Sequence, residues 1–105
     1  MTARVLDKSD VFARLREHQF RMPEFGVQKI GVFGSFARDD ATSNSDVDVL
    51  VEFDPDRKTF DNFMSLSFFL EDILQCRVEL VTTSSLSPHI GPRILASVEY
   101  VTESA

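Results

Sequence analysis

Residues 34–53 read GSFARDDATSNSDVDVLVEF, in which a Gly-Ser pair, a polar loop and an alternating acidic and apolar run follow one another. The alternation that starts at Asp46 has the two-residue period of a β-strand, with valines on one face and acids on the other. The loop at 39–45 consists of turn-forming residues, and Gly34 ends a shorter apolar run at 28–33. The stretch therefore predicts two strands joined by a short helix and a loop.

The rest of the chain supplies further helices and strands. Apolar residues recur at helical spacing in two segments, with Asp7 or Ser9 as the N-cap of the first and Thr59 as the N-cap of the second. Met22-Pro23 should end the first helix, because the residue before a proline avoids the helical region. The expected elements are helices at 7–20 and 59–75, strands at 28–33, 46–53 and 77–82, one or two short helices within 84–97, and room for an edge strand at 99–101. This order predicts an α/β (α+β) fold, a small mixed β-sheet flanked by helices.

Length and composition narrow the class of protein. The 105 residues fit one domain, residues 1–105, with a loose tail at 102–105. A net charge of −6 argues against direct nucleic-acid binding, which relies on clustered Lys and Arg, and suits metal cations or a basic protein partner. The one cysteine, Cys76, favours a reducing, cytoplasmic setting. We see no secretory leader and no apolar run of about 18 residues, so we expect no membrane span.

Four phenylalanines fall in the second long helical segment. Phe60, Phe63, Phe68 and Phe69 are expected to lie mostly in the core. Phe68 and Phe69 widen the apolar stripe sideways, so that part of this helix is also a candidate contact surface for a partner.

The acids of the central strand are the first candidates for chemistry. Asp46 and Asp48 share a face, with Cα atoms about 6.5–7 Å apart. Two carboxylates with no cation beside them are costly unless a metal neutralises them, and hard oxygen ligands suit Mg²⁺. If 77–82 lies beside 46–53 in the right register, Glu79 joins the same face, and three carboxylates can hold two metal ions. Taken alone, the two aspartates fit a solvated turn better than a metal site, and the preceding Gly-Ser turn changes that balance.

The Gly-Ser pair suggests that a phosphate group binds beside the metal. A strand, then Gly34-Ser35, then the start of a helix exposes backbone N–H groups that can receive a phosphate. Gly34 lets the backbone approach closely, and the Ser35 hydroxyl can donate to a phosphate oxygen. Arg38, one turn later, can reach a phosphate too, although an ordinary surface arginine is an equal reading. A phosphate cradle beside paired metal ligands describes a nucleoside-triphosphate site.

These residues carry a family resemblance. The spacing of Gly34-Ser35 and Asp46-x-Asp48 resembles the G-S-x(10)-D-x-D signature of the nucleotidyltransferase superfamily that includes DNA polymerase beta. The segments VELVT (78–82) and SLSPHIGPRIL (85–95) resemble the continuation found in minimal, MNT-type nucleotidyltransferases, which are often encoded beside HEPN-domain toxins. The resemblance runs from about Lys29 to Val101.

The resemblance implies a function and a role for each site residue. Asp46, Asp48 and Glu79 would bind Mg²⁺, with Glu79 also helping to deprotonate the attacking hydroxyl, and Gly34 and Ser35 would hold the triphosphate. AMP would pass from ATP to a hydroxyl of a partner HEPN toxin, usually a tyrosine, and the protein would act as its antitoxin. The alternative is a catalytically weak or inactive antitoxin that neutralises its partner by occlusion.

The sequence departs from the family pattern at two positions. Asp39 stands where the family commonly has glycine, and its extra charge near the expected triphosphate could repel it. Glu79 is one methylene longer than the usual aspartate. Neither change removes a required group.

Overall fold

The computed structural model describes residues 3–101, which build a four-stranded mixed sheet in the order β3-β2-β1-β4. β1 pairs antiparallel with β2 and with β4, whereas β2 and β3 run parallel. The strands are β1 (Val27–Phe33), β2 (Val47–Phe53), β3 (Val78–Thr82) and β4 (Glu99–Tyr100). The predicted small mixed sheet is confirmed, and the edge strand near the end of the described chain is present.

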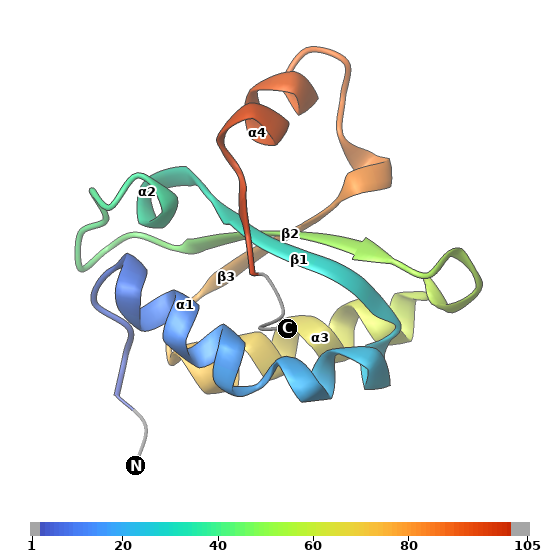
Figure 1. Cartoon of the computed structure of the whole chain (residues 1–105), viewed down its shortest axis with the longest axis horizontal. Helices are drawn as coiled ribbons and strands as arrows, with labels where there is room; N and C mark the ends of the chain where they lie inside the picture. Colours follow the sequence, from blue (N-terminus) through green and yellow to red (C-terminus); the bar gives the residue numbers. More distant parts are fainter. Residues whose placement is uncertain (1–2, 102–105) are drawn as a thin grey trace.

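Helices and 3₁₀ turns connect the strands in the predicted order. They are α1 (Lys8–Glu17), α2 (Gly34–Ala37), α3 (Phe60–Leu74), α4 (Gly91–Ser97), η1 (Gln19–Phe25), η2 (Pro55–Arg57) and η3 (Thr83–Ser85). Figure 1 shows α1 and α3 covering one face of the sheet, while α4 projects from the opposite face. Within residues 3–101, no helix is long and apolar enough to cross a membrane. The predicted loose tail at 102–105 lies outside the described residues.

The core lies between the sheet and the helix pair α1 and α3. The valines predicted to share one face of β2, Val47, Val49 and Val51, are fully buried in it. Leu50 lies on the other face, beside the acids, and is also fully buried although it stands outside this core. The second face is therefore covered at the middle of β2 and open at its beginning, where the acids lie.

Helix ends confirm one prediction and correct another. The side chains of Asp7 and Thr59 accept hydrogen bonds from Asp10 N and Asn62 N, at 2.9 and 3.1 Å, so both N-caps are confirmed. The prediction that Met22-Pro23 ends the first helix is wrong. α1 already ends at Glu17, where His18 leaves helical geometry while its backbone N–H still donates to Arg14 O at 3.1 Å. A 3₁₀ helix then includes Pro23 and continues to Phe25.

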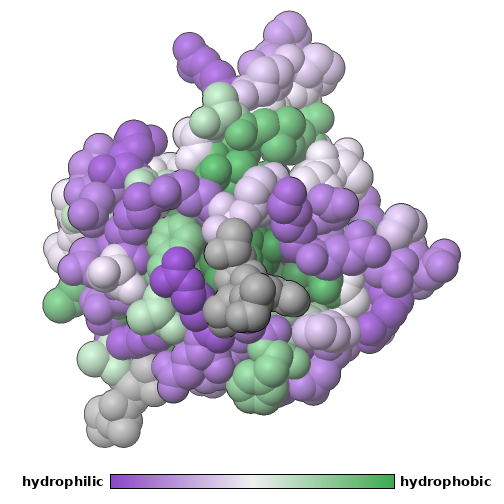
Figure 2. All heavy atoms as spheres, in the orientation of Figure 1, coloured by the Kyte–Doolittle hydropathy of each residue, from purple (hydrophilic) through white to green (hydrophobic). Residues whose placement is uncertain are grey.

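The aromatic residues of α3 are less buried than the spacing predicted. Phe60 and Phe68 are 77% and 63% exposed, whereas Phe63 and Phe69 pack partly against the core. Phe68 lies two residues from Leu66, about 200° around the helix, so it faces solvent when Leu66 faces the sheet. The segment that projects from the other face of the sheet also exposes apolar side chains. Ile90, just before α4, and Leu95, within it, are both more than half exposed. Figure 2 shows apolar atoms at the base of this projecting segment.

Candidate active site

The structure brings Glu79 beside Asp48. β2 and β3 pair in a register that places these two residues directly opposite each other, so their backbones lie about 4.8 Å apart. In-register residues of parallel strands point to the same face, which here is the face opposite the valine core. Asp46 lies one residue before β2 and shares this side by alternation. Asp46 and Asp48 are partly buried, and Glu79 is exposed.

Asp48 is the acid that its surroundings perturb most. Burial, followed by the negative charges of Glu79 and Asp46, raises the pKa of Asp48 from 3.8 to about 6, and the positive charge of Arg38 opposes the change. Desolvation and like charges both disfavour a carboxylate. The three acids therefore form a region of uncompensated negative charge, and a cation placed among them would be bound favourably.

Gly34 is required by the position of Asp48. Its φ is +73°, and a Cβ built on it would lie 2.0 Å from Asp48 Oδ2. Any other residue would both strain the backbone and collide with the carboxylate. The sequence suggested Gly34 as a place where a phosphate approaches the backbone, and the structure adds that the carboxylate of Asp48 occupies the space beside it. The positive φ and this contact are invisible in the spacing of the signature.

Ser35 and Arg38 lie on and just after α2. Ser35 follows Gly34 in the first turn of α2 and is partly buried. Arg38 is exposed and pairs with Asp40 through Nε and Oδ2, 3.3 Å apart, while its charge acts on Asp48. Arg38 therefore lies near Asp48, Ser35 follows the glycine that packs against Asp48, and contact of either residue with a nucleotide stays a prediction.

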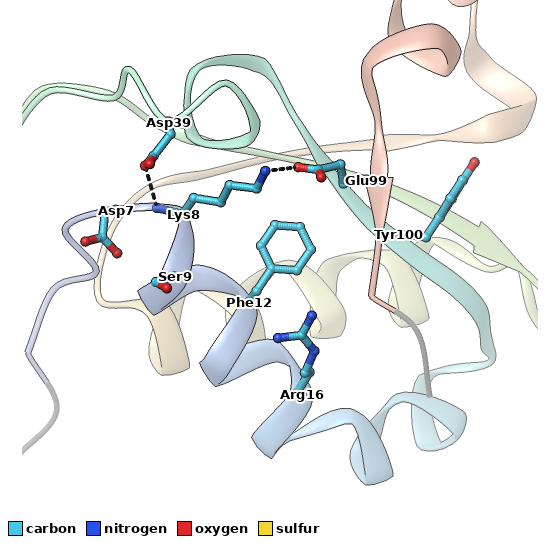
Figure 3. Close-up of a pocket in the computed structure, with 8 residues that line it drawn as sticks. All are labelled: Asp7, Lys8, Ser9, Phe12, Arg16, Asp39, Glu99 and Tyr100. Atoms are coloured by element: carbon cyan, nitrogen blue, oxygen red, sulfur yellow. Dashed lines mark hydrogen bonds and ion pairs between the residues drawn. The ribbon is translucent and has the colours of Figure 1, made fainter. Parts of the chain in front are cut away.

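Asp39 adopts the left-handed conformation that glycine would reach more easily, with φ of 60°. Its Oδ1 accepts a hydrogen bond from the backbone N–H of Lys8, at 3.3 Å, and the Lys8 ammonium pairs with Glu99. Figure 3 shows the Asp39 carboxylate directed at the start of α1. This side chain joins the loop after α2 to α1.

A cavity of about 420 Å³ lies beside α1 and includes Asp39 in its lining. Its other lining residues come from α1, the residue before it and β4, and Asp46, Asp48 and Glu79 are not among them. The cavity and the carboxylates are thus separate features of the structure.

The donor set fits a hard cation at Asp48 and its neighbours. All three side chains offer carboxylate oxygens, the ligand type that Mg²⁺ prefers. Within residues 3–101, no group of three or more His, Cys, Asp or Glu side chains lies close enough together to hold a metal ion, so these acids stand as an open set and not as a preformed metal site. An open set of this kind suits an ion that keeps waters and takes further ligands from substrate phosphates.

Comparison with known proteins places the chain in a family. Residues 15–101 match the nucleotidyltransferase domain family. The protein adenylyltransferase MntA of Thermococcus cleftensis is 40% identical over 98 residues, which cover 92% of this chain and 98% of that protein. A candidate protein adenylyltransferase of Methanocaldococcus jannaschii is 34% identical over 89% of this chain and 96% of its own length.

Solved structures show the same fold. A candidate minimal nucleotidyltransferase, 31% identical, superposes with a TM-score of 0.79 over 90% of this chain and 95% of its own. A toxin–antitoxin complex with AMP-PNP gives 0.66 at 23% identity, over 94% of this chain and 75% of that one. The complex of a tri-AMPylated Shewanella oneidensis HEPN toxin with its MNT antitoxin superposes with a TM-score of 0.64 at 18% sequence identity. The match covers 90% of this chain and 73% of the other chain. With its fold, its Gly-Ser turn and its in-register carboxylates, the chain belongs to the nucleotidyltransferase domain family, among the small protein adenylyltransferases related to MntA.

Proposed function

We propose that this protein is a Mg²⁺-dependent adenylyltransferase that moves AMP from ATP to a hydroxyl of a HEPN-type toxin and so acts as the antitoxin of that toxin. The observation that carries the proposal is the placement of Asp48 opposite Glu79, with Gly34 packed against the Asp48 carboxylate. The 40% identity to a protein adenylyltransferase over nearly the whole chain supports the acceptor class.

Each site residue has a distinct role in the proposed reaction. Asp46, Asp48 and Glu79 would hold the metal, and the turn at Gly34-Ser35 would hold the phosphates. Bound Mg²⁺, as two ions, would neutralise the triphosphate and lower the pKa of the attacking hydroxyl. The acceptor oxygen bonds to the α-phosphorus of ATP as the bond from that phosphorus to the β-phosphate oxygen breaks, and pyrophosphate leaves. Glu79, the exposed acid of the three, would take the hydroxyl proton.

The proposed reaction requires few protein groups, which suits a small chain. Phosphoryl-type transfer needs positioning and neutralisation of charge more than covalent help from the protein. The carboxylates lie at the open end of the face that carries α4, where a protein substrate has access. Partner contact is supported by the exposed apolar side chains of Ile90, just before α4, and Leu95, within it, and the net charge of −6 favours a basic partner. We place the reaction in the cytoplasm, where the single cysteine stays reduced.

The alternative is neutralisation by occlusion without catalysis. Its basis is Asp39 in the position where the family commonly has glycine, together with Glu79 in place of aspartate. The Asp39 carboxylate is engaged by the backbone of Lys8, which weakens the argument that it repels the triphosphate.

One labelling experiment separates the two functions. The protein is incubated with ATP labelled in the α-phosphate, Mg²⁺ and the protein encoded by its neighbouring gene, which the proposal identifies as the toxin. We expect label on the toxin, a loss of at least about 100-fold with Asp46→Asn or Asp48→Asn, and unchanged labelling with Glu52→Gln, an exposed acid farther along β2. Equal labelling by the Asp48→Asn variant would exclude catalysis at these carboxylates. Protection of cells by that inactive variant would favour occlusion.

A further inference from the structure

Asp46 needs support that the sheet does not provide. It precedes the first residue of β2 and follows an exposed polar loop, so its place depends on contacts made by its two neighbours. On the C-terminal side, Val47 N donates to the carbonyl of Arg77, at 3.0 Å. This bond fixes the peptide group that follows Asp46, and any side chain at position 77 would preserve it.

On the N-terminal side, the support comes from a side chain 41 residues away. Nη2 of Arg4 donates to the carbonyl oxygen of Ser45, at 2.9 Å, in a partly buried contact. The carbonyl belongs to the peptide group that joins Ser45 to Asp46. The two peptide groups flanking Asp46 are therefore both held, one by Arg4 and one by the loop before β3.

Arg4 is anchored well enough to act as a fixed point. The next residue, Val5, is fully buried, and its N–H donates to Leu74 O at 3.1 Å. The guanidinium thus extends from a backbone that is tied to the end of α3. A charged donor on an anchored chain makes a stronger and better-aligned hydrogen bond than a free surface arginine.

Ser45 is itself tied to its own loop. Its N–H donates to Thr42 O at 3.0 Å, and its hydroxyl accepts from Thr42 N at 2.9 Å. These local bonds shape the turn, and Ala41 at its start packs against the core. The bond from Arg4 is the contact that relates the end of this turn to the N-terminal segment and α3.

We propose that Arg4 is a positioning residue for Asp46, holding the Ser45 carbonyl so that the Asp46 carboxylate stays beside Asp48. The inference rests on the proposed function, because it takes Asp46 as a metal ligand. Arg4 itself contacts neither metal nor substrate in this role. Groups that orient metal ligands typically contribute 10–100-fold in metal affinity.

The test compares three variants. Arg4→Met removes the donor and keeps most of the apolar stem, and Arg4→Lys keeps a single donor. Arg14→Met is the matched control, because Arg14 is also partly buried and its Nη1 donates to a backbone carbonyl, that of Ile73, at 3.0 Å. Mn²⁺ binding is measured without nucleotide by electron paramagnetic resonance. Amide hydrogen exchange of residues 40–48 is measured without metal.

We expect Arg4→Met to weaken Mn²⁺ binding about tenfold and to speed exchange in 40–48. Arg4→Lys should recover most of both losses, and Arg14→Met should change neither by more than about twofold, even though both methionine variants unfold at lower temperature. In the transfer assay, Arg4→Met should raise the Mg²⁺ concentration at half-maximal rate and largely keep kcat at saturating Mg²⁺.

Three results would overturn the inference. These are equal Mn²⁺ affinities of Arg4→Met and Arg14→Met, no recovery with Arg4→Lys, or a wild-type protein that binds no Mn²⁺. If Mn²⁺ binding depends on Arg4 as expected but the wild-type protein transfers no label to the toxin, the proposed transfer is wrong and the inference about Arg4 stands. The two proposals therefore fail by different measurements.

Discussion

Replacing Asp48 by asparagine should stabilise the metal-free protein at neutral pH. The pKa of Asp48 rises from 3.8 to about 6 on folding, first through burial and then through the charges of Glu79 and Asp46. A shift of this size corresponds to at most about 3 kcal/mol at pH 7, at about 1.36 kcal/mol per pKa unit. Because the side chain is only about half buried, solvent screening reduces the expected penalty to about 1–2 kcal/mol.

The sign of the effect follows from proton binding. Between about pH 3.8 and 6, the folded protein holds the Asp48 proton and the unfolded chain has released it. The stability associated with protonated Asp48 is therefore fully present below the unfolded pKa and is lost as pH rises through about 6. Asparagine resembles the protonated acid at every pH, so the advantage of Asp48→Asn over wild type should grow from pH 4 to pH 7.5.

Urea denaturation with EDTA, at several pH values from 4 to 8, measures this difference. We expect a gain near zero at pH 4 and about 1–2 kcal/mol at pH 7.5, or about 4–15 °C in Tm for a chain of this length. The matched control is Glu52→Gln, which removes an exposed acid of the same strand. If Asp48→Asn shows no pH-dependent gain over that control, the reasoning that the acids repel one another across a partly desolvated site is wrong.

The remaining predictions concern Gly34, Asp39 and the metal. Gly34→Ala should lower the free energy of unfolding in urea by about 2–4 kcal/mol, because of the positive φ and the collision with Asp48. In an Asp48→Ala background the same substitution should cost only about 1 kcal/mol. Additive losses in the double variant would contradict the contact. Asp39→Gly should leave ATP affinity within about twofold by calorimetry, because the Asp39 carboxylate is directed at the backbone of Lys8 and not at the three acids. A tenfold gain in affinity would show that the carboxylate does repel ATP. Mg²⁺ at about 100 times its Kd should raise wild-type stability by about 2.7 kcal/mol in thermal melts, and EDTA should remove the gain; an equal response from Asp48→Asn would refute metal binding there.

Local patterns were sufficient for most elements of the fold. The alternation from Asp46 onward predicted a strand with its valines on one face, and the caps at Asp7 and Thr59 mark real helix starts. These signals work because they depend on neighbours within one turn or one pleat. The end of α1 was missed because the chain leaves α-helical geometry at His18, without a proline or glycine to mark the place, and Pro23 fits within the 3₁₀ helix that follows.

Burial was less predictable than secondary structure. The spacing of α3 placed its phenylalanines in the core, yet Phe60 and Phe68 face solvent. A periodic apolar stripe indicates that one side of a helix is buried but not how wide the buried side is. The width depends on how much of the helix the sheet covers, which is a property of the assembled layers.

The sequence by itself determined the signature residues, their spacing and the family, because these are carried by Gly34-Ser35, Asp46 and Asp48 within fifteen residues. Only the tertiary structure decided which distant groups complete their surroundings. Pairing of β2 with β3 placed Glu79 beside Asp48, and a hydrogen bond across 41 residues joined Arg4 to the peptide before Asp46. No local preference encodes such pairings, since strand register and long-range hydrogen bonds are selected by the burial of the whole sheet against its helices.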